Sequence, residues 1–359
     1  MKILLLRQDR LGDLIISTGI IRNFSILMPK AEIHIILGNK NYFAKHLIEN
    51  YVKKVFHYDK KLINSIKLIF QLRNEKYDYI IDLFDNYSRT SELFIKFINA
   101  KQSVGLNKIN PKGQKVNYDI TLDLLAKDKY HIIDRIAELT KPFFNNINID
   151  NNDNEAIENI DLTSLDLTSL DLTSRDFSPE YNFKTYYNVD NYFAANPSNK
   201  TIFINLFGSS KEKFWGIENN IELIKNILLN QKQNFNIILS TTKDRFDYLN
   251  NIIDGISKTL NMSEYENRFF VMDYNPDLDY VANVISRCDL VITPDTAIVH
   301  IASCFKVKTI ILYQDNEKDY GGKYWTPYKT ECFTLSSDDR NITNISLERL
   351  ISFINNIFH

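Results

Sequence analysis

The chain has 359 residues with a formal net charge of −2, and 44% of them are hydrophobic and 25% charged. This length exceeds one ordinary α/β domain and suits two, in a composition typical of globular proteins. The nearly balanced charge argues against a nucleic-acid-binding protein, and no apolar run approaches the ~20 residues that a membrane-spanning helix needs.

The chain has three cysteines, Cys288, Cys304 and Cys332, which form neither a CxxC motif nor a spacing typical of metal ligands. This pattern fits a reducing compartment, so we expect a cytoplasmic protein. Near the start, the apolar residues 3–6 are followed at once by charged residues, which is not the pattern of a secretory signal.

The first half of the chain alternates between strand and helix patterns. Residues 2–6 and 32–37 read as buried strands, with helical spacing of apolar residues between them. The same reasoning predicts further strands at 55–58, 77–83 and 102–105, and further helices at 41–49, 62–75, 91–98 and 124–140. Such alternation indicates a parallel sheet with right-handed crossovers.

Residues 145–180 differ from the rest of the chain. An Asn-rich stretch is followed by three copies of an Asp-Leu-Thr-Ser unit, beginning at Asp161, Asp166 and Asp171. Three copies of five residues are too short to form a solenoid core, so we interpret them as a repeat expansion in a tolerant surface segment.

The second half repeats the strand–helix alternation. Strands are expected at 200–207, 235–240, 269–272, 290–293 and 309–313, and helices at 217–229, from about 244, at 278–286, from 297 and at 347–358. Two β/α domains in tandem place a cleft between them, where ligands usually bind.

Three stretches carry polar side chains at strand ends. They are Arg7-Gln-Asp-Arg-Leu-Gly-Asp13, Phe207-Gly-Ser-Ser-Lys-Glu-Lys-Phe-Trp215, and Asp289 to His300 with its Thr-Pro-Asp-Thr core. Together, in this order and spacing, they resemble glycosyltransferase family 9, the lipopolysaccharide heptosyltransferases.

This resemblance implies a GT-B fold, which consists of two facing Rossmann-like domains with an interdomain cleft. Residues 1–180 would bind the acceptor and residues 181–345 the nucleotide sugar, while the helix in 346–359 would pack back on the first domain. The reaction would invert the anomeric centre without a metal or other cofactor. It would transfer heptose from ADP-L-glycero-D-manno-heptose to the lipopolysaccharide core.

Asp13 matches the general base of the family, which removes the proton of the acceptor hydroxyl. It follows Gly12, whose missing side chain allows a tight turn. The competing interpretation is that Asp13 only caps its helix. Many members have proline where this chain has Gly19, and a glycine in a helix costs about 1 kcal/mol relative to alanine.

Ser209, Ser210 and Lys213 match the phosphate-binding loop of the family, although the length of the loop leaves Lys211 as an alternative to Lys213. Without a metal, such groups would stabilise the charge of the departing diphosphate.

The family's second phosphate and sugar site corresponds to Asp295, Thr296, Ala297 and His300. These residues begin a helix, where unpaired N–H groups favour an anion. A plain capped helix with a packed histidine is the competing interpretation.

Other candidate positions rest on less specific signals. Asp244, after a strand, is a candidate for the ribose hydroxyls. Trp215 is expected to pack against its domain rather than to stack on a ligand. Arg10 and Arg89 are candidates for acidic groups of the acceptor, since arginine binds carboxylates and phosphates bidentately. Gly12 is assigned to the same acceptor side.

Three alternatives to this function remain open at this point. The same fold can use another nucleotide-sugar donor or a protein acceptor, and the chain can be a non-catalytic binding paralogue. The expected partners are a nucleotide sugar and a lipid-linked or core oligosaccharide, with no nucleic acid. The expected location is the cytoplasm, with peripheral contact to the inner membrane.

Overall fold

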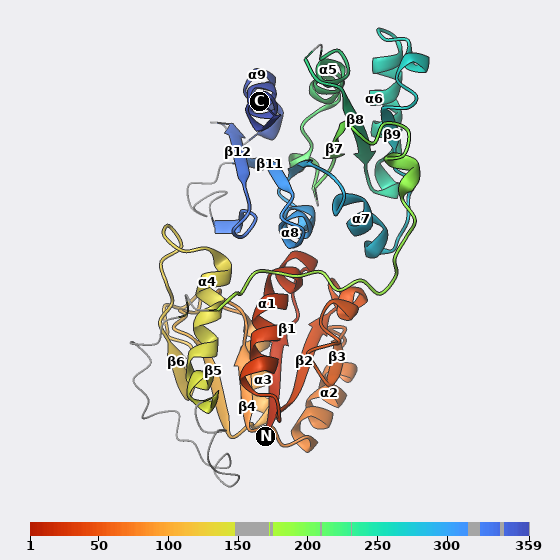
Figure 1. Cartoon of the computed structure of the whole chain (residues 1–359). Coiled ribbons are helices and arrows are strands. Elements are labelled where there is room, and N and C mark those ends of the chain that lie inside the picture. The colour runs from red at the N-terminus through yellow and green to blue at the C-terminus, as the bar shows by residue number, and fades with distance from the viewer. Residues whose placement is uncertain are drawn as a thin grey trace. The chain divides into compact units, whose positions relative to one another are not determined.

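The computed structural model describes residues 1–147, 172, 175–208, 210–230, 232–314, 324–337 and 341–358. The chain divides into two compact units, Met1–Asn182 and Phe183–His359, close to the division after residue 180 that the sequence suggested (Figure 1). Most of the Asp-Leu-Thr-Ser repeat segment lies outside the described residues.

The first unit is built on a six-stranded parallel sheet in the order β3-β2-β1-β4-β5-β6. Its strands are short, mostly apolar runs that suit a sheet covered on both faces. They are β1 Lys2–Arg7, β2 Glu32–Gly38, β3 Lys54–Tyr58, β4 Tyr79–Asp82, β5 Gln102–Leu106 and β6 Ile120–Leu122.

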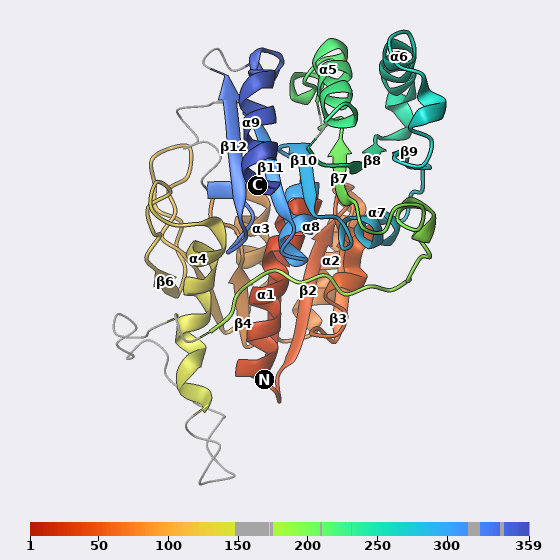
Figure 2. The same cartoon turned by 45° about the horizontal axis from the view of Figure 1, so that its top comes forward.

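Helices cover both faces of this sheet. Alternate side chains of β1, such as Leu4 and Leu6, pack in one core with Leu68 and Phe94 of α2 and α3, while α1 contacts α4 and η2. Figures 1 and 2 show these two helical layers on either side of the strands. The elements are α1 Leu11–Leu27, η1 Tyr42–Leu47, α2 Leu62–Asn74, α3 Arg89–Ile98, α4 Ile132–Ala137 and η2 Glu138–Ile147.

The expected helix over residues 124–140 is wrong in its first part. Residues 124–131 are not helical, and α4 begins only at Ile132. His131 precedes it, and its Nδ1 accepts a hydrogen bond from the N–H of Ile133 at 3.1 Å. This cap satisfies one of the N–H groups that a helix start leaves unpaired, and it fixes the boundary there.

The second unit repeats the same topology, with strand order β12-β11-β10-β7-β8-β9 and all pairs parallel. The sequence pattern missed β12, as it missed β6. The strands are β7 Lys200–Asn205, β8 Phe235–Ser240, β9 Phe269–Val271, β10 Leu290–Pro294, β11 Lys308–Gln314 and β12 Cys332–Ser337.

One apolar core joins the second sheet to α5, α6 and α9, while α7 and α8 contact each other elsewhere on the sheet. The last helix contributes Leu350 and Ile354 to this second core, and its expected packing on the first domain stays a prediction. The helices are α5 Ile217–Leu228, α6 Phe246–Ser257, α7 Leu278–Ile285, α8 Ala297–Cys304 and α9 Leu347–Phe358, with the short turns η5 Asp190–Tyr192, η6 Lys211–Lys213, η7 Lys243–Arg245, η8 Met262–Glu264 and η11 Ile342–Asn344.

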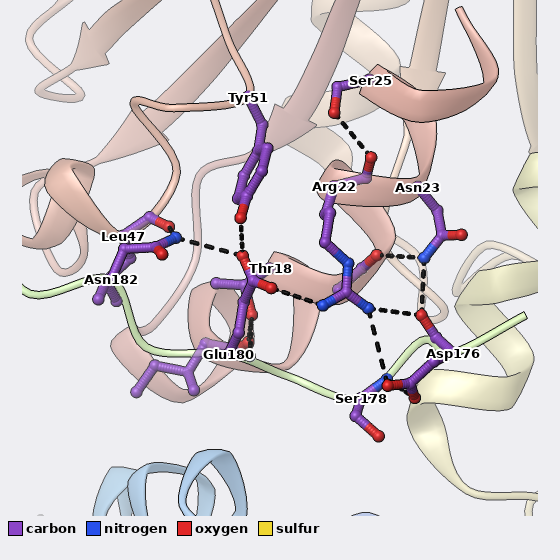
Figure 3. A network of polar contacts seen from close by, with 12 residues as sticks. Thr18, Arg22, Asn23, Ser25, Leu47, Tyr51, Asp176, Ser178, Glu180 and Asn182 are labelled. Atoms are coloured by element: carbon purple, nitrogen blue, oxygen red, sulfur yellow. Dashed lines mark hydrogen bonds and ion pairs between the residues drawn. The ribbon is translucent and has the colours of Figure 1, made fainter.

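The last part of the first unit, residues 176–182, lies across α1 and is held by polar contacts (Figure 3). The Arg22 guanidinium donates to Glu180 Oε2 at 2.5 Å, and Thr18 Oγ1 accepts from the Glu180 N–H at 2.8 Å. The Tyr51 hydroxyl donates to the other Glu180 oxygen. These contacts fix the segment to the first unit up to Asn182, whose amide donates to a backbone carbonyl of η1.

Gly19 of α1 faces this crossing segment. A Cβ atom at Gly19 would lie 2.3 Å from the carbonyl oxygen of Ser178 and 2.4 Å from that of Phe177, which real side chains do not tolerate. The glycine therefore has a packing reason that the sequence pattern did not reveal, and its weaker helix propensity is offset by the close approach of the segment.

Candidate functional site

In each sheet, the chain builds strands outward in one direction from a central strand and then in the other direction from the strand beside it. The reversal lies between β1 and β4 in the first unit and between β7 and β10 in the second. In open parallel sheets, ligands bind outside the carboxyl ends of the strands at this switch point. The sequence-predicted residues follow these same four strands. Asp13 comes after β1, Arg89 after β4, Lys213 after β7 and Asp295 after β10.

Asp13 lies in the first turn of α1 and its side chain is only 14% exposed. One carboxylate oxygen, Oδ2, accepts from the backbone N–H of Arg10 at 3.2 Å. Asp13 therefore contributes to the cap of its helix, as the competing interpretation held, and its role as a base stays a prediction. Arg10 itself is exposed, and Gly12 is partly buried beside it.

Arg7, the last residue of β1, is a buried arginine that sequence reasoning did not assign. Its Nε donates to the backbone carbonyl of Asp13 at 2.9 Å, and its Nη2 lies 3.5 Å from Asp13 Oδ1. Its Nη1 donates to the carbonyl of Leu83, just after β4, at 2.9 Å. One guanidinium thus joins the loops that follow both strands of the switch point. The signal available in sequence was a charged residue ending an otherwise apolar strand.

A second buried cation holds the loop after β4. Lys108 Nζ lies 2.6 Å from Asp82 Oδ2 and donates to the Phe84 carbonyl at 2.9 Å, and both ion-pair partners are almost fully buried. Tyr118 donates its hydroxyl proton to the same carboxylate oxygen at 2.7 Å. Because a buried charge is stable only when it is paired and hydrogen-bonded, this network fixes the loop that leads to α3.

Arg89 is the first residue of α3 and is exposed. A cation at a helix N-terminus meets the positive end of the helix dipole, so this arginine does not serve the stability of the helix. Ser88 supplies the cap instead, since its Oγ accepts from the Ser91 N–H. Arg10 and Arg89 therefore follow neighbouring strands and remain candidates for the acidic groups of a ligand.

In the second unit, the loop after β7 folds back on itself. Phe207 and Phe214 form an isolated β-bridge, and their rings stack with centroids 4.2 Å apart. Gly208 lies directly beneath Lys213, where a Cβ atom would come within 2.4 Å of the lysine side chain. This fold returns Lys213 to the end of β7.

Lys213 meets the segment after β10. Its Nζ lies 2.5 Å from Asp295 Oδ2 and donates to the Asp295 carbonyl oxygen at 2.8 Å. Lys211, the alternative lysine, is exposed on the same short turn, whereas Lys213 contacts Asp295 of the third motif. Ser210 precedes this turn, whereas Ser209 lies outside the described residues.

The start of α8 follows β10 at the switch point of the second sheet. Thr296 is its N-cap and accepts from the Ile298 N–H through Oγ1 at 3.2 Å, and Ala297 is its first residue. Asn205, at the end of β7, donates to the hydroxyl oxygens of Thr293 at 2.9 Å and Thr296 at 3.4 Å. Sequence reasoning missed Asn205, which ties the two strands of this switch point together.

The His300 ring is turned inward, and only 6% of the residue is exposed. The ring packs against Trp325 with centroids 6.0 Å apart. This is the packed position that the competing interpretation gave for His300, and any contact with a ligand stays a prediction.

Tyr313, at the end of β11, is buried near Asp295. Burial, together with the charge of Asp295, raises the pKa of the Tyr313 hydroxyl well above its ordinary value. Among the residues that the structure describes, no group forms a hydrogen bond with this hydroxyl.

Trp215 is buried and donates its indole N–H to the Ile345 carbonyl at 3.1 Å, which confirms the prediction that it packs within its domain.

Asp244 follows β8 as expected and is well exposed, and a hydrogen bond from Thr242 lowers the pKa of its carboxyl. Its role toward a ribose stays a prediction.

The described residues contain no group of three or more His, Cys, Asp or Glu side chains that could hold a metal ion. Within the same residues, no helix combines the length and the apolar character needed to cross a membrane.

Comparison with known proteins gives one family match and several structural ones. The model of glycosyltransferase family 9 (heptosyltransferase) matches residues 65–346. No curated protein matches the chain.

Solved structures share the fold at low sequence identity. A glycosyl transferase family 9 protein from Veillonella parvula DSM 2008 has 15% identity and a TM-score of 0.69 over 99% of this chain and 96% of that one. The E. coli ADP-heptose lps heptosyltransferase II has 15% identity and a TM-score of 0.64, covering 99% and 98%. The E. coli heptosyltransferase WaaC with ADP has 13% identity and a TM-score of 0.66, covering 99% and 100%.

The family match spans most of the chain, and it includes the motifs after β7 and β10. The similar solved structures support the fold, because a protein built of two Rossmann-like units of this kind has the GT-B fold. The protein therefore belongs to glycosyltransferase family 9 and is a glycosyltransferase with the GT-B fold.

Proposed function

We propose that the protein transfers heptose from ADP-L-glycero-D-manno-heptose to a lipopolysaccharide or lipooligosaccharide core acceptor, with inversion and without a metal or other cofactor. Membership of the family supports heptose as the transferred sugar. ADP as the nucleotide of the donor is supported by two similar solved structures, one named for ADP-heptose and one that contains ADP. The observation that carries the proposal is the meeting of Lys213 and Asp295 beside the start of α8, at the β7/β10 switch point.

The donor diphosphate would lie at the N-terminus of α8. Its negative charge would be met by Lys213 and by the first N–H groups of the helix, which point outward from Thr296 and Ala297. Lys213 would then turn from Asp295 toward phosphate, and Asp295 would accept hydrogen bonds from sugar hydroxyls. Ser209 and Ser210 would add hydroxyl donors, Asp244 would bind the ribose, and His300 would support the helix from its buried side.

The transfer would begin at Asp13. Its carboxylate takes the proton of the acceptor hydroxyl, the hydroxyl oxygen bonds to the anomeric carbon, and the bond from that carbon to the diphosphate breaks. ADP leaves with the bonding electrons, and its charge is stabilised by Lys213 and α8. Arg10, Gly12 and Arg89 would line the acceptor side of the reaction.

The acceptor would be a lipid-linked or core oligosaccharide. Its acidic groups suit the exposed guanidinium groups of Arg10 and Arg89. Such an acceptor is assembled at a membrane surface, so we place the enzyme on the cytoplasmic face of the inner membrane as a peripheral protein.

Calorimetric titration of the full chain with ADP, UDP and GDP, without added metal, tests the donor. We expect selective binding of ADP, weakened about 10- to 100-fold in Lys213→Ala because a charged hydrogen bond is lost. Lys211→Ala, on the same turn, is the matched control and should bind normally. Preference for UDP or GDP would reject ADP-heptose, and binding of none of the three would favour a non-catalytic paralogue.

Turnover tests the base. Asp13→Asn should lower kcat by about 10²- to 10⁴-fold while donor affinity is kept, since a general base contributes about this much. Asp9→Asn removes a carboxylate from the same loop and serves as the control. If the enzyme transferred the sugar to a protein rather than to a core saccharide, the proposed reaction would stand and the proposed acceptor would be wrong.

A further inference from the structure

Helix α2 shows large apolar side chains to solvent. Ile63, Ile66 and Phe70 are 68%, 46% and 63% exposed, and only Leu68 and Leu72 of the helix are fully buried. Exposed apolar residues are ordinary when they are scattered, but these three recur on one helix at spacings of three and four.

The helix geometry points this row away from the sheet. Residues two apart on a helix differ by about 200°, so Ile66 and Phe70 lie nearly opposite the buried Leu68 and Leu72. Figure 1 shows α2 on the outside of the first unit, next to β3. The neighbouring α3 packs against α2 and exposes Leu93 and Phe97.

The same helix is basic along its length. Lys60 and Lys61 precede it, Lys67 and Arg73 lie on it, and no acidic residue occurs between Lys60 and Asn74. Among the described residues, none of these four cations forms an ion pair, whereas Lys2 and Lys54 are paired with Glu75 just beyond the helix. Asp59 attracts Lys61 electrostatically, but no described ion pair balances the positive charge around the apolar row.

We propose that this surface, the α2 face, binds the headgroup region of an anionic lipid bilayer. We define the α2 face as Ile63, Ile66 and Phe70 with the four cations Lys60, Lys61, Lys67 and Arg73. The apolar side chains enter the boundary between headgroups and acyl chains, and the cations contact the lipid phosphates. The combination selects a bilayer, because an apolar row alone would fit a protein and a basic row alone would fit any polyanion.

The inference stands apart from the donor and the acceptor, because it rests on a helix that carries none of the proposed site residues. It assigns a surface to the peripheral membrane location proposed above. Its test contains no sugar transfer, so its failure would count against that location and leave the proposed transfer reaction unaffected.

Sedimentation of the full chain with vesicles measures the binding. Vesicles of phosphatidylcholine with about 30% phosphatidylglycerol should bind the protein, and pure phosphatidylcholine vesicles should bind it far less. Each lysine near an anionic surface changes the partition by about fivefold. Binding should therefore also weaken as salt is raised to 0.5 M, where exposed charges are screened.

Two variants and their matched controls locate the surface. Lys60→Gln/Lys61→Gln/Lys67→Gln should lower the partition about 100-fold, while the exposed Lys232, Lys243 and Lys258 of the second unit, changed together to glutamine, should leave it unchanged. Ile66→Ser/Phe70→Ser should lower it about tenfold or more, against the control Ile26→Ser/Leu229→Ser, which removes two exposed apolar side chains elsewhere.

All four variants change exposed side chains, so their melting temperatures should stay near that of the wild type. Wild-type protein that does not bind anionic vesicles would overturn the proposal. So would binding that survives both α2 variants. Self-association that is lost in Ile66→Ser/Phe70→Ser, without vesicle binding, would show that a second copy covers this face instead.

Discussion

The guanidinium of Arg7 contacts Asp13 twice, through Nε to its backbone carbonyl and through Nη2 to its carboxylate. The third contact of Arg7 reaches the loop after β4. A buried arginine therefore holds Asp13, the proposed base, in position relative to the neighbouring strand, and we expect it to act on the reaction through Asp13.

Replacing Arg7 tests this positioning. We expect Arg7→Met to lower kcat about 100-fold, because a displacement of about 1 Å at a reacting group costs this much. Donor affinity, measured by titration with ADP, should not change, since Arg7 is in the other unit. Arg7→Lys keeps the charge and should recover part of the rate. A folded Arg7→Met protein with wild-type kcat would contradict the assignment.

The pairing of Lys213 with Asp295 predicts coupling between the two residues in donor binding. In a double-mutant cycle of Lys213→Ala and Asp295→Ala, the effects on ADP affinity should differ from additivity by about 0.5–3 kcal/mol, as for residues in contact. Asp295→Ala alone should weaken ADP less than Lys213→Ala does, because it frees the lysine for phosphate. Strict additivity, measured by calorimetry, would show that the ion pair has no part in the site.

Gly19→Ala should destabilise the protein, although alanine is the better helix former. The added Cβ overlaps the backbone carbonyls of Phe177 and Ser178, and such overpacking typically costs about 1–3 kcal/mol. Urea unfolding measures the change. Gly255→Ala, in α6, is the matched control, because its Cβ meets only the flexible end of Ile221 and should have a smaller effect. Equal effects at both positions would contradict the packing argument.

Glu75 should give the first unit a pH-dependent stability. Hydrogen bonds from Lys54 and Lys2 lower the pKa of Glu75 from 4.5 to about 2. Its stabilisation is therefore complete above about pH 4.5, where the carboxylate is also ionised in the unfolded chain, and is lost as the pH falls toward 2.

Glu75→Gln should lower the free energy of unfolding by about 1 kcal/mol at pH 7, in the range for ion pairs near a surface. The difference from the wild type should shrink between pH 5 and pH 3 in urea titrations. The control is Glu49→Gln, which breaks the exposed ion pair with Lys45 and should change the free energy of unfolding little at any pH in this range. A Glu75→Gln effect that does not vary with pH would contradict the role of its charge.

Local pattern alone was enough to place most elements and to identify the polar strand ends. Buried strands appear as short apolar runs and helices as apolar residues at helical spacing, so Asp13, Asp244 and Asp295 could each be placed after a strand. Proline, N-caps and turn residues act within a few positions, which is why they are visible in sequence. Two of the four edge strands, β6 and β12, were missed, because neither is a long apolar run: β6 is only Ile120–Leu122, and β12 reads Cys-Phe-Thr-Leu-Ser-Ser.

Only the tertiary structure decided which of these positions meet. The contacts of Arg7 with Leu83 and of Lys213 with Asp295 join segments that are 76 and 82 residues apart in the chain. The contact of Lys213, rather than Lys211, with Asp295, the burial of His300 and the need for Gly19 all depend on such distant neighbours. A sequence pattern carries no information on sheet order or on the folding back of a loop, because both are set by the packing of the whole unit rather than by the residues nearby.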